Sequence, residues 1–73
     1  MSLYTKTIIE LTGCTPEEAP LVEGFMRNTY GVLDGISRAT FRREAKECLL
    51  VARRHPEAAQ DNARSHGLIR GKS

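Results

Sequence analysis

The strongest periodic pattern in the chain is the stretch SRATFRREAKECLLVARR, residues 37–54. Its apolar residues recur at the spacing of one side of an α-helix. They are Phe41, Ala45, Cys48, Leu49 and Ala52. Ser37 precedes them as a preferred N-cap residue, because its hydroxyl can accept a hydrogen bond from a backbone N–H group of the first turn. The stretch therefore predicts a helix over residues 38–54, roughly 25 Å long, with one face in a core.

The opposite face of this predicted helix is basic. At about 100° per residue, the side turned away from Phe41 gathers five cations around a single leucine. We call this set the cationic face; it consists of Arg42, Arg43, Lys46, Leu50, Arg53 and Arg54. Basic side chains gathered on one side of a small domain create a positive potential that attracts acidic partners. The cationic face is therefore the candidate partner-binding site.

Two shorter helices are predicted before this stretch. The first covers about residues 3–12 and ends at Gly13, which can adopt the left-handed conformation common after a helix. The second follows the sequence TPEE, residues 15–18. There a threonine and a glutamate three residues later form a capping box. Gly31 can end this second helix.

Two residues within the predicted second helix, Pro20 and Gly24, are unfavourable in a helix interior. Pro20 either kinks the helix or marks the start of its regular part, because proline removes a backbone hydrogen bond. Gly24 costs about 1 kcal/mol relative to alanine in a helix interior. The close approach of a neighbouring helix would explain its presence.

The complete pattern predicts an all-α protein. No segment shows the sustained apolar–polar alternation of a strand. We expect a compact bundle of three main helices plus a short C-terminal helix that runs from Pro56 to about His66. Residues 1–68 should form a single helical domain, and residues 69–73 a flexible basic tail. The predicted core consists of Ile8, Leu11, Val22, Phe25, Met26, Leu33, Ile36, Phe41, Ala45, Cys48, Leu49 and Ala52.

Length and charge restrict what such a domain can do. Seventy-three residues allow one domain, and 40% apolar with 27% charged residues is an ordinary globular composition. The formal net charge of +2 is unevenly distributed, because residues 1–37 carry −3 and residues 38–73 carry +5. This asymmetry points to an acidic partner for the second half of the chain.

The sequence favours neither catalysis nor metal binding. Cys14 and Cys48 lie 34 residues apart, and with His55 and His66 they lack the ligand spacing of a zinc site. No nucleophile has a base and an orienting partner at a recognisable spacing. We therefore expect a protein that is not an enzyme, with no metal, no cofactor and no small-molecule substrate. Both thiols should be buried and inert.

The expected location is cytoplasmic, without a membrane. No apolar run approaches the roughly 18 residues that span a bilayer, and no secretory signal is apparent at the start of the chain. Two cysteines without such a signal agree with a reducing compartment.

One segment resembles a known DNA-binding motif. The sequence GISRATFRR, residues 35–43, is similar to the turn and the start of the recognition helix in helix-turn-helix domains of resolvase- and invertase-type recombinases. The resemblance implies DNA contacts by residues at the start of the helix; they would be Arg38, Thr40, Arg42 and Arg43. It covers nine of 73 residues and departs upstream, where Asp34 stands in place of the usual apolar residue.

Two functions therefore remain open. The first is a small non-enzymatic interaction module whose cationic face binds an acidic protein surface, or a second copy of the chain. Leu50 among arginines favours it, since arginine is enriched at protein interfaces and its stem can cover apolar surface while its charge seeks a carboxylate. The alternative is a helix-turn-helix-like DNA-binding regulator that uses residues 35–43.

Overall fold

The computed structural model describes residues 3–69, which form four α-helices and no strand. The helices are α1 (Leu3–Thr12), α2 (Ala19–Tyr30), α3 (Arg38–Arg54) and α4 (Pro56–Ser65). The all-α prediction is confirmed. The finer prediction, three main helices plus a short C-terminal one, fits only loosely. α1 and α4 have the same length of 10 residues.

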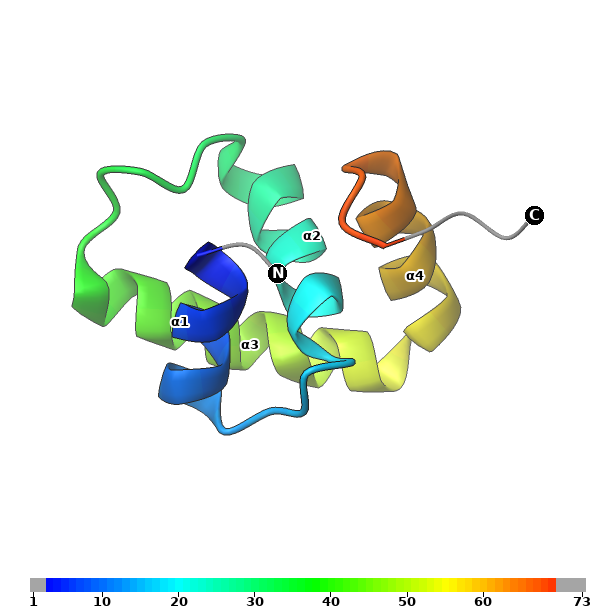
Figure 1. The fold of residues 1–73 in the computed structure, drawn as a ribbon, viewed down its shortest axis with the longest axis horizontal. Coiled ribbons are helices and arrows are strands. Elements are labelled where there is room, and N and C mark those ends of the chain that lie inside the picture. Colours follow the sequence, from blue (N-terminus) through cyan, green and yellow to red (C-terminus); the bar gives the residue numbers. More distant parts are fainter. Residues whose placement is uncertain (1–2, 70–73) are drawn as a thin grey trace.

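The helices are arranged around α2. Figure 1 shows α3 along the long axis of the molecule, with α1 and α2 lying across it and α4 beside α2 at the far end. α2 packs against each of the other three helices, most extensively against α4. Within residues 3–69, no helix combines the length and the apolar character needed to cross a bilayer. The predicted basic tail lies outside the described residues, except for Ile69.

The predicted capping box forms at the start of α2. The Thr15 N–H donates to Glu18 Oε1 over 3.1 Å, and the Glu18 N–H donates to Thr15 Oγ1 over 3.2 Å. Residues 16–18 form a turn, and the regular helix begins at Ala19 with Pro20 in its first turn. A proline is tolerated there because its missing N–H would have no partner within the helix. Pro20 therefore marks the start of the helix.

The boundaries predicted for α3 are confirmed. The Thr40 N–H donates to Ser37 Oγ over 3.2 Å, which is the expected N-cap bond. The helix ends at Arg54, since His55 leaves the helical conformation directly before Pro56. A residue that precedes proline is disfavoured in the α-helical region, which explains the break between α3 and α4.

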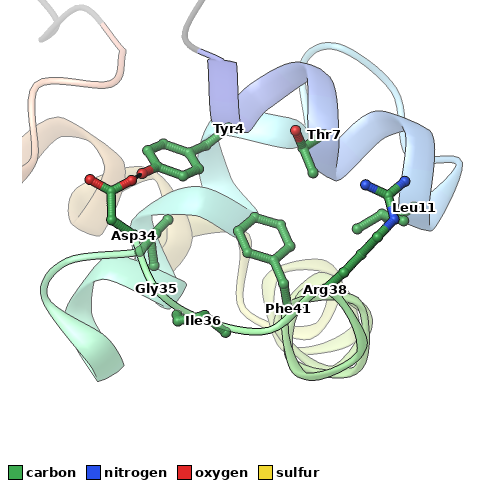
Figure 2. A pocket seen from close by; sticks show the side chains of 9 residues that line it. Tyr4, Thr7, Leu11, Asp34, Gly35, Ile36, Arg38 and Phe41 are labelled. Carbon is green, nitrogen blue, oxygen red and sulfur yellow. Dashed lines mark hydrogen bonds between the residues drawn. The ribbon is translucent and has the colours of Figure 1, made fainter.

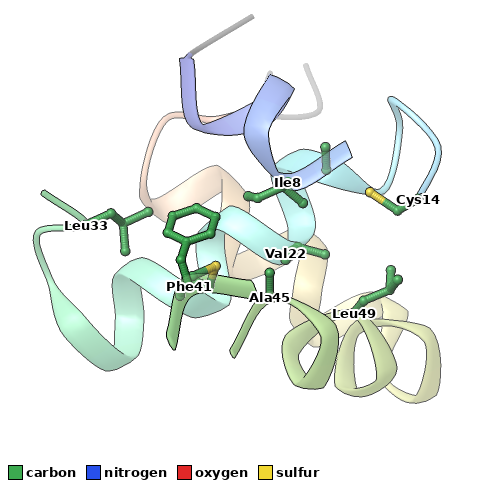
Figure 3. Packing of buried hydrophobic residues seen from close by; sticks show 9 residues of the cluster. Ile8, Cys14, Val22, Leu33, Phe41, Ala45 and Leu49 are labelled. Carbon is green, nitrogen blue, oxygen red and sulfur yellow. The ribbon is translucent and has the colours of Figure 1, made fainter. Parts of the chain in front are cut away.

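The core lies where α1, α2 and α3 meet. Figure 3 shows Ile8 of α1 and Val22 of α2 packed near Phe41, Ala45 and Leu49 of α3. Four residues of the predicted core are only partly buried; they are Leu11, Phe25, Ile36 and Cys48. Four buried hydrophobic residues outside the predicted core are Cys14, Ala19, Ala59 and Ala63. Leu11 and Ile36 stay partly exposed because they line an open cleft.

Gly24 permits the close packing of α4 on α2. A Cβ atom on Gly24 would lie 3.1 Å from the backbone Cα and N atoms of Ala63. Ala59 and Ala63 are fully buried on the α4 side of this contact. The predicted close approach of a neighbouring helix is therefore confirmed, and the neighbour is α4.

The chain folds back onto α4 directly after the helix ends. Gly67 has a φ of +70°, and the Leu68 N–H donates to the Ala63 carbonyl over 2.9 Å. This is the six-to-one hydrogen bond of a Schellman motif, which satisfies a carbonyl that the helix itself leaves free. It holds Leu68 against the last turn of α4.

Candidate interaction surface

All six residues of the cationic face are exposed on the outer side of α3. Leu50 has 57% of its surface exposed. The next residue, Val51, is 43% exposed and adds a second apolar side chain that the sequence analysis did not single out. The outer side of α3 therefore combines cations with a small apolar centre.

Arg53 differs from the other cations because it is paired across helices. Its Nε lies 2.7 Å from Glu18 Oε2, and its terminal N–H group donates to Glu18 Oε1 over 3.2 Å. This two-point contact, together with the hydrogen bond from the Thr15 N–H, lowers the pKa of the Glu18 carboxyl to about 2. Arg53 therefore has a structural contact that ties α3 to the start of α2.

The remaining cations are open to solvent. Arg42, Lys46 and Arg54 make no hydrogen bond or ion pair with any other residue in the described range 3–69. Arg43 has one distant carboxylate neighbour, with 3.8 Å between its Nε and Glu44 Oε1. Four positive charges on α3 thus have little or no electrostatic partner within the fold.

The residues of the DNA-binding resemblance occupy different environments. Arg38 is exposed and lines the cleft described next, whereas the Thr40 hydroxyl is half-buried and accepts a hydrogen bond from Ser37. The linker between α2 and α3 spans the seven residues 31–37. Helix-turn-helix motifs commonly join their helices by a turn of about 3–4 residues. Arg42 and Arg43 are the members of the set that lie on the open face.

An open cleft of about 250 Å³ lies between α1, residues 33–36 and the start of α3. Figure 2 shows Phe41 near its centre, the hydrogen-bonded pair Tyr4 and Asp34 at one end, and Leu11 and Arg38 at the other. The Tyr4 ring stacks on Phe41 with 6.3 Å between ring centroids. Pockets for small molecules usually measure about 300–1,000 Å³, so this cleft is below their usual size.

A buried polar cluster beside the cleft was not predicted. The Glu23 carboxylate is fully buried in α2, where it accepts hydrogen bonds from Thr5 Oγ1 over 3.1 Å and from Arg27 Nε over 2.8 Å. The Arg27 guanidinium lies 5.6 Å from the centre of the Tyr4 ring, and the Tyr4 hydroxyl donates to Asp34. The only sequence signal was the i, i+4 spacing of Glu23 and Arg27. The cluster joins α1, α2 and the linker before α3, so its charges have a structural use.

Both cysteines are free thiols. Cys14 is buried and Cys48 is half-buried, and burial, together with the nearby carboxylates of Glu44 and Glu47, raises the pKa of Cys48 to about 11. A thiol with that pKa is protonated at neutral pH and is a poor nucleophile. No group of three or more His, Cys, Asp or Glu side chains converges within the part of the chain that the structure describes.

Comparison with family models, with curated proteins and with solved structures gives no match to this chain. Function must therefore be inferred from the surface of the molecule itself.

Proposed function

We propose that this protein is a non-enzymatic interaction module that binds an acidic protein surface through the outer side of α3. The observation that carries the proposal is the group of open cations Arg42, Arg43, Lys46 and Arg54 around the exposed Leu50. Charges that stabilise a fold are commonly paired, as Arg53 is with Glu18. Arg42, Lys46 and Arg54 have no such partner within residues 3–69 and Arg43 has only a distant one, so a partner from outside the chain explains these cations best.

The apolar centre favours a protein partner. Leu50 and Val51 expose adjacent apolar surface, and the stems of the flanking arginines add more, because a long cationic side chain can lie on apolar surface while its charge stays in water. Protein interfaces combine an apolar centre with arginine and a polar rim. The phosphate backbone of DNA would contact only the cations, and Leu50 would then make no contact with it.

DNA binding is the second candidate. It is supported by Arg38, Arg42, Arg43 and Lys46, which are all exposed along the first half of α3. The seven-residue linker before α3 weakens the comparison with a helix-turn-helix. We therefore rank DNA second and let one experiment decide between the two partners.

The test measures binding to two labelled probes by fluorescence anisotropy, at about 50 and 200 mM salt. One probe is an amphipathic peptide with leucines flanked by glutamates, and the other is random-sequence duplex DNA. The peptide should bind, and Arg42→Gln/Lys46→Gln should weaken it at least about tenfold, because both charges are open. The matched control is Lys6→Gln/Arg38→Gln, which removes one lysine and one arginine outside the cationic face and should change peptide affinity less than about twofold.

Three results would overturn the protein-binding proposal. The first is no peptide binding at the lower salt concentration. The second is equal peptide affinity for the wild type and Arg42→Gln/Lys46→Gln. The third is tighter binding to DNA than to the peptide, with a steep salt dependence that Arg38→Gln and Arg43→Gln both reduce, which would establish the DNA-binding alternative.

A further inference from the structure

We infer that the outer side of α3 binds a second copy of the same chain, with the two α3 helices antiparallel. This inference rests on the proposed function, since it uses the same side of α3, and it names a second copy of the chain as an occupant of that side. The residues that carry it are Glu47, Leu50, Val51 and Arg54, which we call the self-complementary strip.

The strip is a continuous exposed band on α3. On a helix with about 100° per residue, these four positions fall within a sector of roughly 100°. Leu50 and Val51 are 57% and 43% exposed, and Glu47 and Arg54 are also exposed. Glu47 lies one turn before the apolar pair, and Arg54 lies one turn after it. The band therefore has an apolar centre with a negative charge at one end and a positive charge at the other.

Such a band is complementary to itself under a two-fold rotation. With the axis between Leu50 and Val51, Leu50 faces the partner's Val51, and Glu47 faces the partner's Arg54. In a symmetric interface each contact occurs twice, so two apolar contacts and two ion pairs form. No residue of the strip then faces a like charge.

The charges also select the orientation. In a parallel arrangement about a two-fold axis, Glu47 would face the partner's Glu47, and Arg54 would face the partner's Arg54. Like charges placed together oppose association, and opposite charges at helix interfaces set the choice and orientation of a partner. The antiparallel pair is therefore the arrangement that the strip specifies.

Tyr30, the last residue of α2, is a further exposed aromatic side chain and lies near Glu44 of α3. It is 40% exposed, and its pKa is raised by partial burial and by the Glu44 carboxylate near its hydroxyl. Glu44 lies two turns before Val51 on the same side of α3. Even so, a crossing of two helices buries less than the roughly 1,200 Å² of a typical stable interface. We therefore expect a weak dimer, with a dissociation constant between about 10 µM and 1 mM.

The experiment is sedimentation velocity of the full chain at concentrations from about 10 µM to 1 mM, with circular dichroism to show that each variant is folded. The wild type should move from monomer to dimer over this range. Leu50→Asp should remain monomeric. Glu47→Arg and Arg54→Glu should each raise the dissociation constant at least about tenfold, because each places like charges together at both ends of the interface.

Mixing the two charge variants tests the contact directly. Glu47→Arg carries two arginines in its strip, and Arg54→Glu carries two glutamates. An equimolar mixture should therefore form a heterodimer about as stable as the wild-type dimer, since both ends of the interface again hold an ion pair, one in the wild-type orientation and one with its signs exchanged. A variant that had lost affinity through misfolding would not recover in this way.

The outcomes separate this inference from the proposed function. A wild type that stays monomeric at the highest concentration, a dimer that Leu50→Asp leaves unchanged, or a mixture that does not associate would each overturn the antiparallel dimer. If the monomer still binds the acidic peptide, the proposed function stands without the dimer. If the dimer forms as described and the peptide does not bind, self-association stands and the separate acidic partner is excluded.

Discussion

α2 and α3 handle their charged residues in opposite ways. α2 packs against three helices, and its Glu23 is buried and bonded to Thr5 and Arg27. α3 places one side in the core and leaves four cations on its other side with little or no partner in the described chain. Charges around α2 hold the helices together, whereas the four open cations on α3, unlike its Arg53, make no close contact that stabilises the fold. Substitutions in the two regions should therefore have separable effects.

The largest loss of stability is expected from Gly24→Val in α2. The added side chain would meet the Ala63 backbone, where even a Cβ atom would be only 3.1 Å away, so α4 would have to move. Overpacking of this kind costs about 1–3 kcal/mol, and we expect the upper end because the obstacle is backbone. Urea denaturation followed by circular dichroism measures the change. Ala39→Val, at an exposed position of α3, should cost less than about 0.7 kcal/mol; equal losses would show that α2 and α4 are not closely packed.

The second effect concerns the buried carboxylate. Glu23→Gln keeps the size of the side chain but removes the charge that Thr5 and Arg27 bind. Hydrogen bonds to charged groups contribute about 1.5–3 kcal/mol, so we expect a loss of about 2 kcal/mol in the free energy of unfolding. The same substitution at the exposed Glu47 of α3, measured in dilute protein, should change it by less than about 0.5 kcal/mol. If the two variants were equally stable, the distinction between the helices would be wrong.

The smallest effect is expected from the ion pair between Glu18 and Arg53, which joins the start of α2 to α3. Its contribution to stability depends on pH. The pKa of Glu18 is lowered from 4.5 to about 2, chiefly by Arg53. A carboxyl whose pKa is depressed by folding adds stability above its ordinary pKa, and this contribution is lost as the pH falls from about 4.5 to about 2. Glu18→Gln should therefore reduce the loss of stability over this window. The reduction should be small, because the Arg53 side chain is 55% exposed and water screens the pair.

The measurement is urea denaturation at several pH values between about 2 and 6 for the wild type and the variant. Glu17→Gln is the matched control, since Glu17 is the exposed neighbour of Glu18, and it should follow the wild-type curve. A Glu18→Gln curve parallel to that of the wild type would show that the ion pair does not form in solution.

Local signals were sufficient to predict the helices. Ser37 and the periodic residues of 38–54 defined both ends and the buried side of α3, because capping and helical periodicity depend on residues that are neighbours in sequence. The capping box at 15–18 formed for the same reason. Exposure of the cationic face also followed from periodicity alone.

Contacts between distant segments could not be predicted in this way. The pairing of Arg53 with Glu18 joins residues 35 positions apart, and it depends on how α3 passes the start of α2. The burial of Glu23 depends on Thr5 from α1, which no spacing reveals. Ala59 and Ala63 are buried where α4 comes close to Gly24, and the sequence alone did not show which helix approaches that glycine.

The close approach of α4 to Gly24 of α2 also bears on the order in which the helices unfold. The buried residues of α4 are two alanines. Each contributes one methyl group, and burial of such a group stabilises the fold by only about 0.8 kcal/mol. Opening of α4 would leave the cluster of α1, α2 and α3 covered on its other sides. Proteins open in cooperative units that differ in stability. The amide protons of α4 should therefore exchange with solvent before those of α2, so that α4 opens while the cluster of α1, α2 and α3 is still folded.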